Sequence, residues 1–217
     1  MAPLLTSARF ATTVARLAQL PEDDGVPEVA FVGRSNAGKS SAINALCQRR
    51  RLAFASKTPG PTQARNYFAL GPGALPPQAF VVDTPGYGFA TAPIEVKRAW
   101  DQLAGRYLSQ RRSLAGVVLV LDIRRGLTDL DRTLLGWLRP EVPLLVLLTK
   151  CDKLTQAQRA KAMRQTEEAL VALRLPNPLV LLSFSATHQI GIEEARTFIG
   201  DWLAHCATGT PLGQELE

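Results

Sequence analysis

The stretch Gly33-Arg34-Ser35-Asn36-Ala37-Gly38-Lys39-Ser40 decides the fold. It fits the pattern GxxxxGK[ST], in which a glycine-rich loop turns backbone N–H groups toward phosphate oxygens. A short apolar strand is predicted before it, at 28–32, and a helix after it, at 39–49. A glycine turn that only joins a strand to a helix would not need Lys-Ser at the helix start. We therefore predict a phosphate-binding loop, with Ser41 in the first helical turn also facing the phosphates.

Along the rest of the chain, short apolar and β-branched runs alternate with helical stretches. This alternation is typical of a mainly parallel sheet covered by helices on both faces, and two runs are apolar throughout, as central strands should be. A capping box, Thr155-Gln156-Ala157-Gln158, supports the start of the fourth helix. The fold class is therefore α/β, a three-layer P-loop NTPase with a mostly parallel six-stranded sheet. Strands are predicted at 28–32, 65–70, 79–83, 117–122, 144–149 and 179–184, and helices at 39–49, 94–108, 129–138, 156–173 and 192–203.

The composition fits one globular domain. The chain has 217 residues, 46% hydrophobic and 20% charged, which is enough for a sizeable core. Its longest apolar runs, 116–121 and 143–148, are too short to cross a bilayer, so we expect no membrane insertion. The net charge of +6 is consistent with a polyanionic partner, although codon bias toward arginine explains it equally well. Three cysteines without a CxxC pair favour a reducing, cytoplasmic location.

We divide the chain into an N-terminal arm or helix at 1–25, a main domain at 26–205 and a C-terminal tail at 206–217. The first 20 residues contain Arg9, Arg16 and no acid, a composition shared with organellar transit peptides. They lack the continuous apolar stretch of a secretory signal. We therefore expect a surface helix or arm of the mature domain.

Ligands of parallel sheets bind beyond the carboxyl ends of the strands, so we expect the ligand-binding residues in the loops that follow strands. Asp83-Thr84-Pro85-Gly86 follows the third strand. There Asp83 can hold Mg²⁺ through water while Gly86 senses a terminal phosphate. In the phosphate loop, Lys39 would reach the β and γ oxygens and Ser40 would ligate the metal.

Two later loops carry residues that predict which nucleotide base is bound. Thr149-Lys150-Cys151-Asp152 follows the fifth strand and fits the pattern [NT]KxD, in which the carboxylate accepts from two N–H groups of guanine and so excludes adenine. The stem of Lys150 can lie across the base, and Ser185-Ala186 after the sixth strand can offer a backbone N–H to guanine O6. Each motif alone could be an ordinary solvated turn. Their order after successive strands predicts a guanine nucleotide site.

The segment Lys57-Thr58-Pro59-Gly60-Pro61-Thr62-Gln63 predicts a switch. Thr62 is the expected third magnesium ligand, beside Ser40 and Asp83, and Thr58 is the second choice. Gly60 would bring backbone to the nucleotide. A plain exposed loop is the alternative.

Together GRSNAGKSS at 33–41, KTPGPTQ at 57–63 and DTPGYGF at 83–89 resemble the EngB/YihA-type bacterial GTPases, over residues 20–203. The resemblance implies a Ras-like G domain of the TrmE-Era-EngA-EngB-septin class, acting as a monomer on GTP and GDP with Mg²⁺. It also implies a switch in large (50S) ribosomal subunit assembly, with the precursor and its rRNA as partners, and a need in cell division and septation. Two departures are Pro61, where the family often has a basic residue, and the loop 183–187.

Slow hydrolysis is expected. Ras-type enzymes orient the attacking water with a glutamine after DxxG, but Tyr87 stands here. Related G domains complete the site with a cation, so Asn36 is a candidate K⁺ ligand that would act with Lys39 and Thr62 in catalysis. Alternatively, Asn36 only braces the loop. No catalytic role is expected for His188.

Arginine-rich and aromatic stretches are the candidate contacts for a partner. Arginine clusters at 49–51, 111–112 and 124–125 could meet rRNA phosphates, or be solvated loop and helix ends. Tyr87 and Phe89 are predicted to be exposed for a partner, with packing near Trp100 as the alternative. A nucleotide-binding scaffold of the division machinery is the rival function, and an ATP-using enzyme is disfavoured by Asp152.

Overall fold

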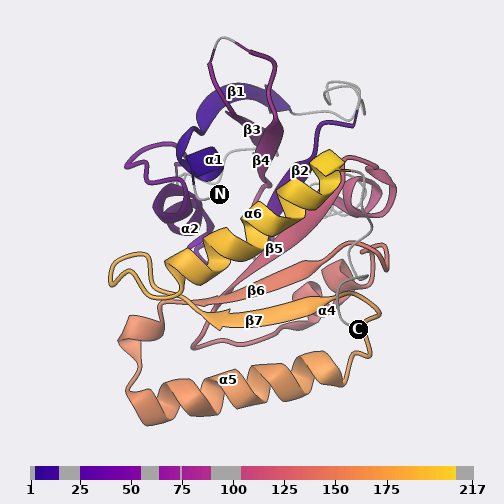
Figure 1. Cartoon of the computed structure of the whole chain (residues 1–217). Helices are drawn as coiled ribbons and strands as arrows, with labels where there is room; N and C mark the ends of the chain where they lie inside the picture. The colour runs from indigo at the N-terminus through magenta and orange to yellow at the C-terminus, as the bar shows by residue number, and fades with distance from the viewer. Residues whose placement is uncertain (1–2, 15–24, 55–63, 74, 89–103, 209–217) are drawn as a thin grey trace.

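A seven-stranded sheet forms the centre of the computed structural model, which describes residues 3–14, 25–54, 64–73, 75–88 and 104–208. The strand order is β1-β3-β4-β2-β5-β6-β7 (Figure 1). The strands are β1 (Arg9–Val14), β2 (Glu28–Gly33), β3 (Arg65–Leu70), β4 (Ala79–Asp83), β5 (Leu114–Asp122), β6 (Leu144–Thr149) and β7 (Leu179–Ser183).

Six of the seven strands run in the same direction, and only β3 runs the opposite way. Strand β2 pairs in parallel with both β4 and β5, and the parallel arrangement continues through β6 to β7. Strand β3 is antiparallel to β4 and to β1. The carboxyl ends of β2, β4, β5, β6 and β7 therefore meet at one edge of the sheet, which is where ligands of such folds bind.

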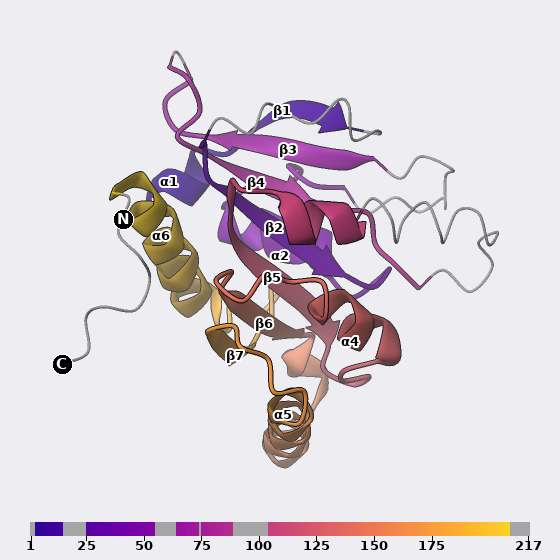
Figure 2. The same ribbon diagram turned by 90° about the vertical axis from the view of Figure 1, so that its right-hand side faces the viewer.

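Helices cover both faces, which gives three layers. On one face lie α1 (Pro3–Thr6), α2 (Lys39–Leu46) and α6 (Ile192–Thr208). On the other lie α4 (Asp129–Leu135), α5 (Gln156–Val171) and a helical segment at 104–110, and Figure 2 shows α4 and α6 on opposite sides of the strands. In the part of the chain described, no helix is both long and apolar enough to span a membrane.

The predicted fold class is confirmed, and the predicted strand count is wrong. The seventh strand is β1, within the segment expected to be an arm or helix; the helix found there, α1, has only four residues. Four of the six residues of β1 are exposed, so its sequence has no buried alternating face to reveal it. It is held by pairing with β3, a distant partner in sequence.

Most other boundaries agree within a few residues. The predicted capping box of α5 is present, with the backbone N–H of Gln158 donating to Thr155 Oγ1. Strand β5 begins at Leu114, three residues before the predicted start. Of the predicted helix at 94–108, residues 94–103 lie outside the described residues, and 104–108 are helical.

Gly116 sets how closely α6 packs on β5. A Cβ atom there would lie 2.1 Å from a ring carbon of Trp202, whose indole is 5% exposed. We expect Gly116→Ala to lower the free energy of unfolding by about 2 to 3 kcal/mol, because the ring must move out of a packed core. Urea denaturation measures this. The control is Gly200→Ala in α6, the helix that carries Trp202, because an added Cβ there meets nothing within 4 Å. It should not destabilise the protein. Equal stability of Gly116→Ala and the parent would contradict the packing argument.

A buried charged cluster lies at the amino end of β2, at the opposite end of that strand from the phosphate loop. Glu28 is 1% exposed and accepts hydrogen bonds from Arg111 Nε at 3.0 Å and from Tyr107 Oη at 2.6 Å. The guanidinium carbon of Arg65 lies 4.9 Å from the centre of the Tyr107 ring. Burial, followed by the charge of Glu28, raises the pKa of Tyr107 well above its usual value, so its hydroxyl remains a donor.

Candidate functional site

The phosphate loop begins where β2 ends. A Cβ on Gly33 would lie 2.5 Å from the carbonyl oxygen of Val120 in β5, so only glycine allows the two strands to approach here. Gly38 and Asn36 have φ values of +99° and +62°, in the left-handed region that glycine and asparagine tolerate best. Lys39 then begins α2. The loop therefore presents the backbone N–H groups of Lys39, Ser40 and Ser41 at a helix N-terminus, which favours anions.

The second motif meets the first through an ion pair. The ammonium of Lys39 contacts the carboxylate of Asp83 at the end of β4, and the two side chains are only 10% and 6% exposed. Thr84 holds the turn after Asp83 by donating from Oγ1 to the carbonyl oxygen of Phe31 at 2.8 Å. The predicted phosphate lysine and predicted metal acid are thus neighbours.

The segment that follows lies against the phosphate loop. A Cβ on Gly86 would be 3.0 Å from the backbone nitrogen of Ser35, and Ser35 N donates to the carbonyl oxygen of Tyr87 at 2.9 Å. Gly86 therefore lies directly against the predicted phosphate loop.

Tyr87 is buried, so its predicted exposure for a partner is wrong. Its side chain is 4% exposed and its hydroxyl donates to Asp131 of α4. The same carboxylate accepts from Thr128 N at 2.7 Å and caps that helix. Burial, and then the charge of Asp131, raises the pKa of Tyr87 well above its usual value. A fully buried acceptor thus draws the ring inward. Phe89 and Trp100 lie outside the described residues.

The base motif is tied to the phosphate loop. Thr149, buried at the end of β6, donates from Oγ1 to the carbonyl oxygens of Ala37 and Leu121, sharing its single proton between them. Lys150 adopts φ +59° and donates from Nζ to the carbonyl oxygen of Asn36 at 2.7 Å. The stretches predicted to hold the phosphates and the base therefore form one continuous surface.

Asp152 lies in the short helix η2 (Cys151–Lys153) and is held by the loop after β7. Ser185 Oγ donates to its Oδ1 at 2.7 Å, and this bond holds the pKa of Asp152 below its usual range, so the side chain is ionised at neutral pH. Its Oδ2 is buried and, among the described residues, has no well-oriented hydrogen bond, although Lys153 Nζ is 3.2 Å away. This second oxygen is paired with Lys153 in the structure, so a ligand would reach it only if the Lys153 side chain moves. Ala186 follows Ser185 beside it.

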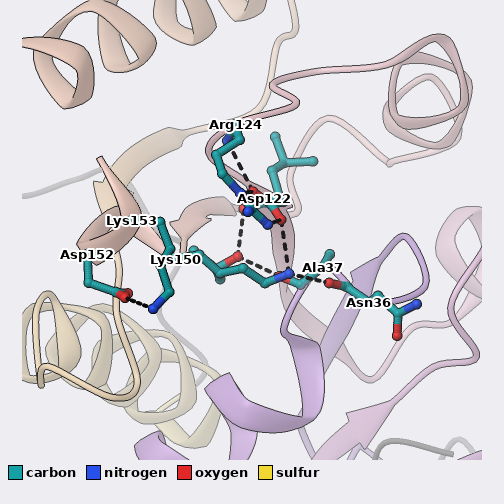
Figure 3. Close-up of polar contacts among 9 residues, drawn as sticks. Asn36, Ala37, Asp122, Arg124, Lys150, Asp152 and Lys153 are labelled. Carbon is teal, nitrogen blue, oxygen red and sulfur yellow. Dashed lines mark hydrogen bonds and ion pairs between the residues drawn. The ribbon is translucent and has the colours of Figure 1, made fainter. Parts of the chain in front are cut away.

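Asp122 and Arg124 were not identified as site residues from the sequence. Asp122 ends β5, and its Oδ2 accepts from Lys150 Nζ at 2.9 Å (Figure 3). Arg124 donates hydrogen bonds to the same carboxylate from Nε at 2.9 Å and from Nη2 at 2.6 Å. The sequence did offer one signal for Asp122, because an acid at the carboxyl end of a parallel strand lies where ligands of such sheets bind.

The arginine clusters differ in exposure. Arg111 is 7% exposed and bound to Glu28, so the prediction that it meets rRNA, or is solvated, is wrong. Arg124 is half exposed and bound to Asp122, while Arg49, Arg50 and Arg51 are exposed. The basic surface is therefore smaller than the sequence implied.

The predicted metal ligands are only partly described. Gly60, Thr62, Thr58 and Pro61 lie outside the described residues. The described residues contain no group of three or more His, Cys, Asp or Glu side chains that could hold a metal ion. Nucleotide-bound Mg²⁺ needs no such group, because it is held by one or two side chains together with phosphates and water. Ser40, a hydroxyl in the first turn of α2, and Asp83, a carboxylate at the end of β4, are side chains of the kind that Mg²⁺ binds, and Lys39 beside Ser40 contacts Asp83.

Comparisons with known proteins agree with this geometry. A family model described as "50S ribosome-binding GTPase" matches residues 28–150. The "Probable GTP-binding protein EngB" of Burkholderia vietnamiensis (strain G4 / LMG 22486) is 49% identical over 221 residues, covering 99% of this chain and all of the relative. The protein of the same name from Burkholderia cenocepacia (strain HI2424) is 50% identical over 207 residues, 94% of each chain.

Solved structures show the same fold. The crystal structure of a probable GTP-binding protein engB has a TM-score of 0.60 at 23% identity, over 82% of this chain and 99% of that one. Era in complex with MgGDPNP and nucleotides 1506–1542 of 16S ribosomal RNA has a TM-score of 0.59 at 19% identity, over 88% of this chain and 59% of that one. With a family model spanning more than half of the chain and relatives half identical over nearly all of it, this chain belongs to the EngB family of P-loop GTPases.

Proposed function

We propose that this GTPase binds Mg²⁺ with GTP or GDP at the carboxyl edge of its sheet and acts as a switch in assembly of the large (50S) ribosomal subunit. The observation that carries the proposal is the joining of the predicted motifs: Lys39 contacts Asp83, and Lys150 donates to the phosphate loop at Asn36. These contacts unite the predicted phosphate, metal and base residues in one site.

Each residue has a distinct role in this proposal. Lys39 neutralises the β and γ phosphates, while Ser40, Ser41 and the loop 33–38 supply backbone and hydroxyl groups. Ser40 and Thr62 would hold Mg²⁺, Asp83 would reach it through water, and the metal would supply positive charge beside the phosphates. Asp152 selects guanine, Lys150 lies along the ring, and Ser185-Ala186 offers an N–H to O6. For these roles the ion pair between Lys39 and Asp83 would have to open, so that Lys39 can face the phosphates and Asp83 the metal.

Gly86 and the segment at 57–63 would carry the switch. Gly86 lies against Ser35, so a backbone N–H there is well placed to report a γ phosphate. Thr62 and Gly60 would close over the metal when that phosphate is present. The bound nucleotide would thereby change the surface offered to a partner.

Hydrolysis without a partner should be slow. The hydroxyl of Tyr87 is directed to Asp131 in the core, so it cannot orient an attacking water. The side chain of Asn36 is on an exposed residue and has no hydrogen bond to the described part of the chain, which favours a ligand role over a bracing one. K⁺ held by Asn36 would supply charge to the transition state.

We therefore expect faster GTP turnover in K⁺ than in Na⁺ at equal ionic strength, by about tenfold or more, since one well-placed charge contributes about 10²-fold or more in such sites. Phosphate release under single-turnover conditions measures this. Asn36→Ala should remove the difference and Asp129→Asn should keep it. Equal rates in both salts would remove K⁺ from the mechanism.

The ribosomal role draws on the description of the family model and on the exposed arginines at 49–51. Sedimentation of the purified protein with 50S precursors tests it. GTP should promote association, GDP should not, and binding should weaken steeply as salt rises. Absence of nucleotide-dependent association would favour the scaffold of the division machinery instead, in which hydrolysis is incidental.

The proposal also covers the location, the oligomeric state and the domain bounds of the protein. We place it in the cytoplasm as a monomer, with a role in cell division and septation that follows from ribosome supply. All three cysteines are free thiols and two are buried, which fits a reducing compartment. The main domain would span 26–205 with a tail at 206–217. Within the N-terminal segment at 1–25, strand β1 pairs with β3 and so belongs to the same sheet as the main domain.

A further inference from the structure

Asp122 is a buried acid whose position is explained by neither the phosphate nor the metal motif. It is the last residue of β5 and is 7% exposed. In Figure 3 its carboxylate lies between Arg124 and the ammonium of Lys150, which also reaches the phosphate loop at Asn36.

The carboxylate is held firmly from one side. Arg124 donates three hydrogen bonds to it, from its backbone nitrogen to Oδ1 at 3.1 Å, from Nε to Oδ1 at 2.9 Å and from Nη2 to Oδ2 at 2.6 Å. Although burial alone would raise it, the pKa of Asp122 is held well below its usual range by the bonds from Arg124 and Lys150. Asp122 is therefore a fixed negative charge at neutral pH.

Lys150 receives its position from that charge. A lysine has a flexible four-carbon stem, and ordering it lowers entropy. Here Nζ is fixed at two points, 2.9 Å from Asp122 Oδ2 and 2.7 Å from Asn36 O, while the backbone is fixed at φ +59°. With both ends held, the methylene stem between them keeps little conformational freedom.

We propose that Asp122 is a positioning residue of the nucleotide site: it holds Lys150 against the phosphate loop so that the lysine stem is preset for the guanine ring, and Arg124 orients the carboxylate. This inference rests on the proposed guanine site. Asp122 does not touch the nucleotide itself. Its effect is preorganisation, which appears as a slower release of bound nucleotide because less ordering is needed on binding.

The test is a double-mutant cycle in the full chain, read by fluorescent GDP binding and stopped-flow release. Asp122→Asn keeps the shape and removes the charge, and should raise Kd about tenfold, mainly through faster release. In a Lys150→Met background the same change should alter Kd less than twofold, because the two residues act as a unit. Asp129→Asn makes the same chemical change on a side chain that is fully exposed, and should have no effect.

Arg124→Ala gives a second reading that does not disturb a buried residue, since that side chain is half exposed. It should raise Kd threefold to fivefold, and again only when Lys150 is present. Normal GDP binding by Asp122→Asn, or an equal loss in the presence and absence of Lys150, would overturn the positioning role. Failure of the parent protein to prefer GDP over ADP would overturn the guanine site itself, and this inference with it.

Discussion

Replacing Asp152 with asparagine is expected to lower the affinity for GDP by roughly 100- to 1,000-fold and to favour xanthosine nucleotides. The carboxylate would accept two charge-assisted hydrogen bonds from guanine, each contributing about 1.5 to 3 kcal/mol. An asparagine keeps one acceptor and turns the other toward guanine as a donor. The 2-oxo group of xanthine accepts from such a donor, so the preference should invert. Competition titrations with GDP, XDP and ADP measure this.

The matched control for Asp152 is Glu167→Gln, which removes one negative charge from the exposed face of α5. It should leave all three affinities unchanged. Ser185→Ala should have a smaller effect of the same sign, because it removes the bond that orients Asp152 Oδ1 at 2.7 Å. Unchanged selectivity in Asp152→Asn would show that another group reads the base.

Glu28→Ala is expected to be the most destabilising change at the far end of β2, by about 3 to 5 kcal/mol. The carboxylate is 1% exposed and accepts from Arg111 and Tyr107 inside the core. Removing it takes away the counter-charge to which a buried guanidinium donates, while leaving that guanidinium in place. Since the total free energy of unfolding of a domain is only about 5 to 15 kcal/mol, this variant should lose much of its stability. Urea unfolding measures the difference.

A second variant separates the buried charge from simple loss of volume. Glu28→Met combined with Arg111→Met removes these two charges together while Arg65 stays on the Tyr107 ring, and it should be more stable than Glu28→Ala, because an apolar pair of similar size suits a core. Glu167→Gln should unfold like the parent. If Glu28→Ala unfolds at the same urea concentration as the parent, the cluster contributes nothing to stability.

The sequence predicted the local backbone of the glycine-rich turn and of single strands well, because local backbone conformation depends on neighbours in the chain. The spacing of Gly33, Gly38 and Lys39 requires a tight turn followed by a helix start, and the structure has φ +99° at Gly38 with α2 beginning at Lys39. The apolar run 144–148 similarly predicted a central strand, and β6 is buried along its whole length.

Contacts between distant segments could not be read from the sequence. Asp122 meets Lys150 because β5 and β6 are neighbours in a register that pairs Asp122 with Thr149. Tyr87 was expected at the surface, since a loop residue gives no sign that a buried Asp131 will lie within reach of its hydroxyl. In each case the neighbours in the sequence give no sign of the partner, and only strand order and helix packing reveal it.

The sequence by itself determined the α/β class, the phosphate loop and the order of the base and metal motifs, because each follows from short-range spacing and the apolar period of single elements. Tertiary structure alone decided that β1 joins the sheet, that Tyr87 turns inward and that Asp122 holds Lys150. These last features depend on strand register and on which charges become buried together, and both are set by the packing of the whole sheet.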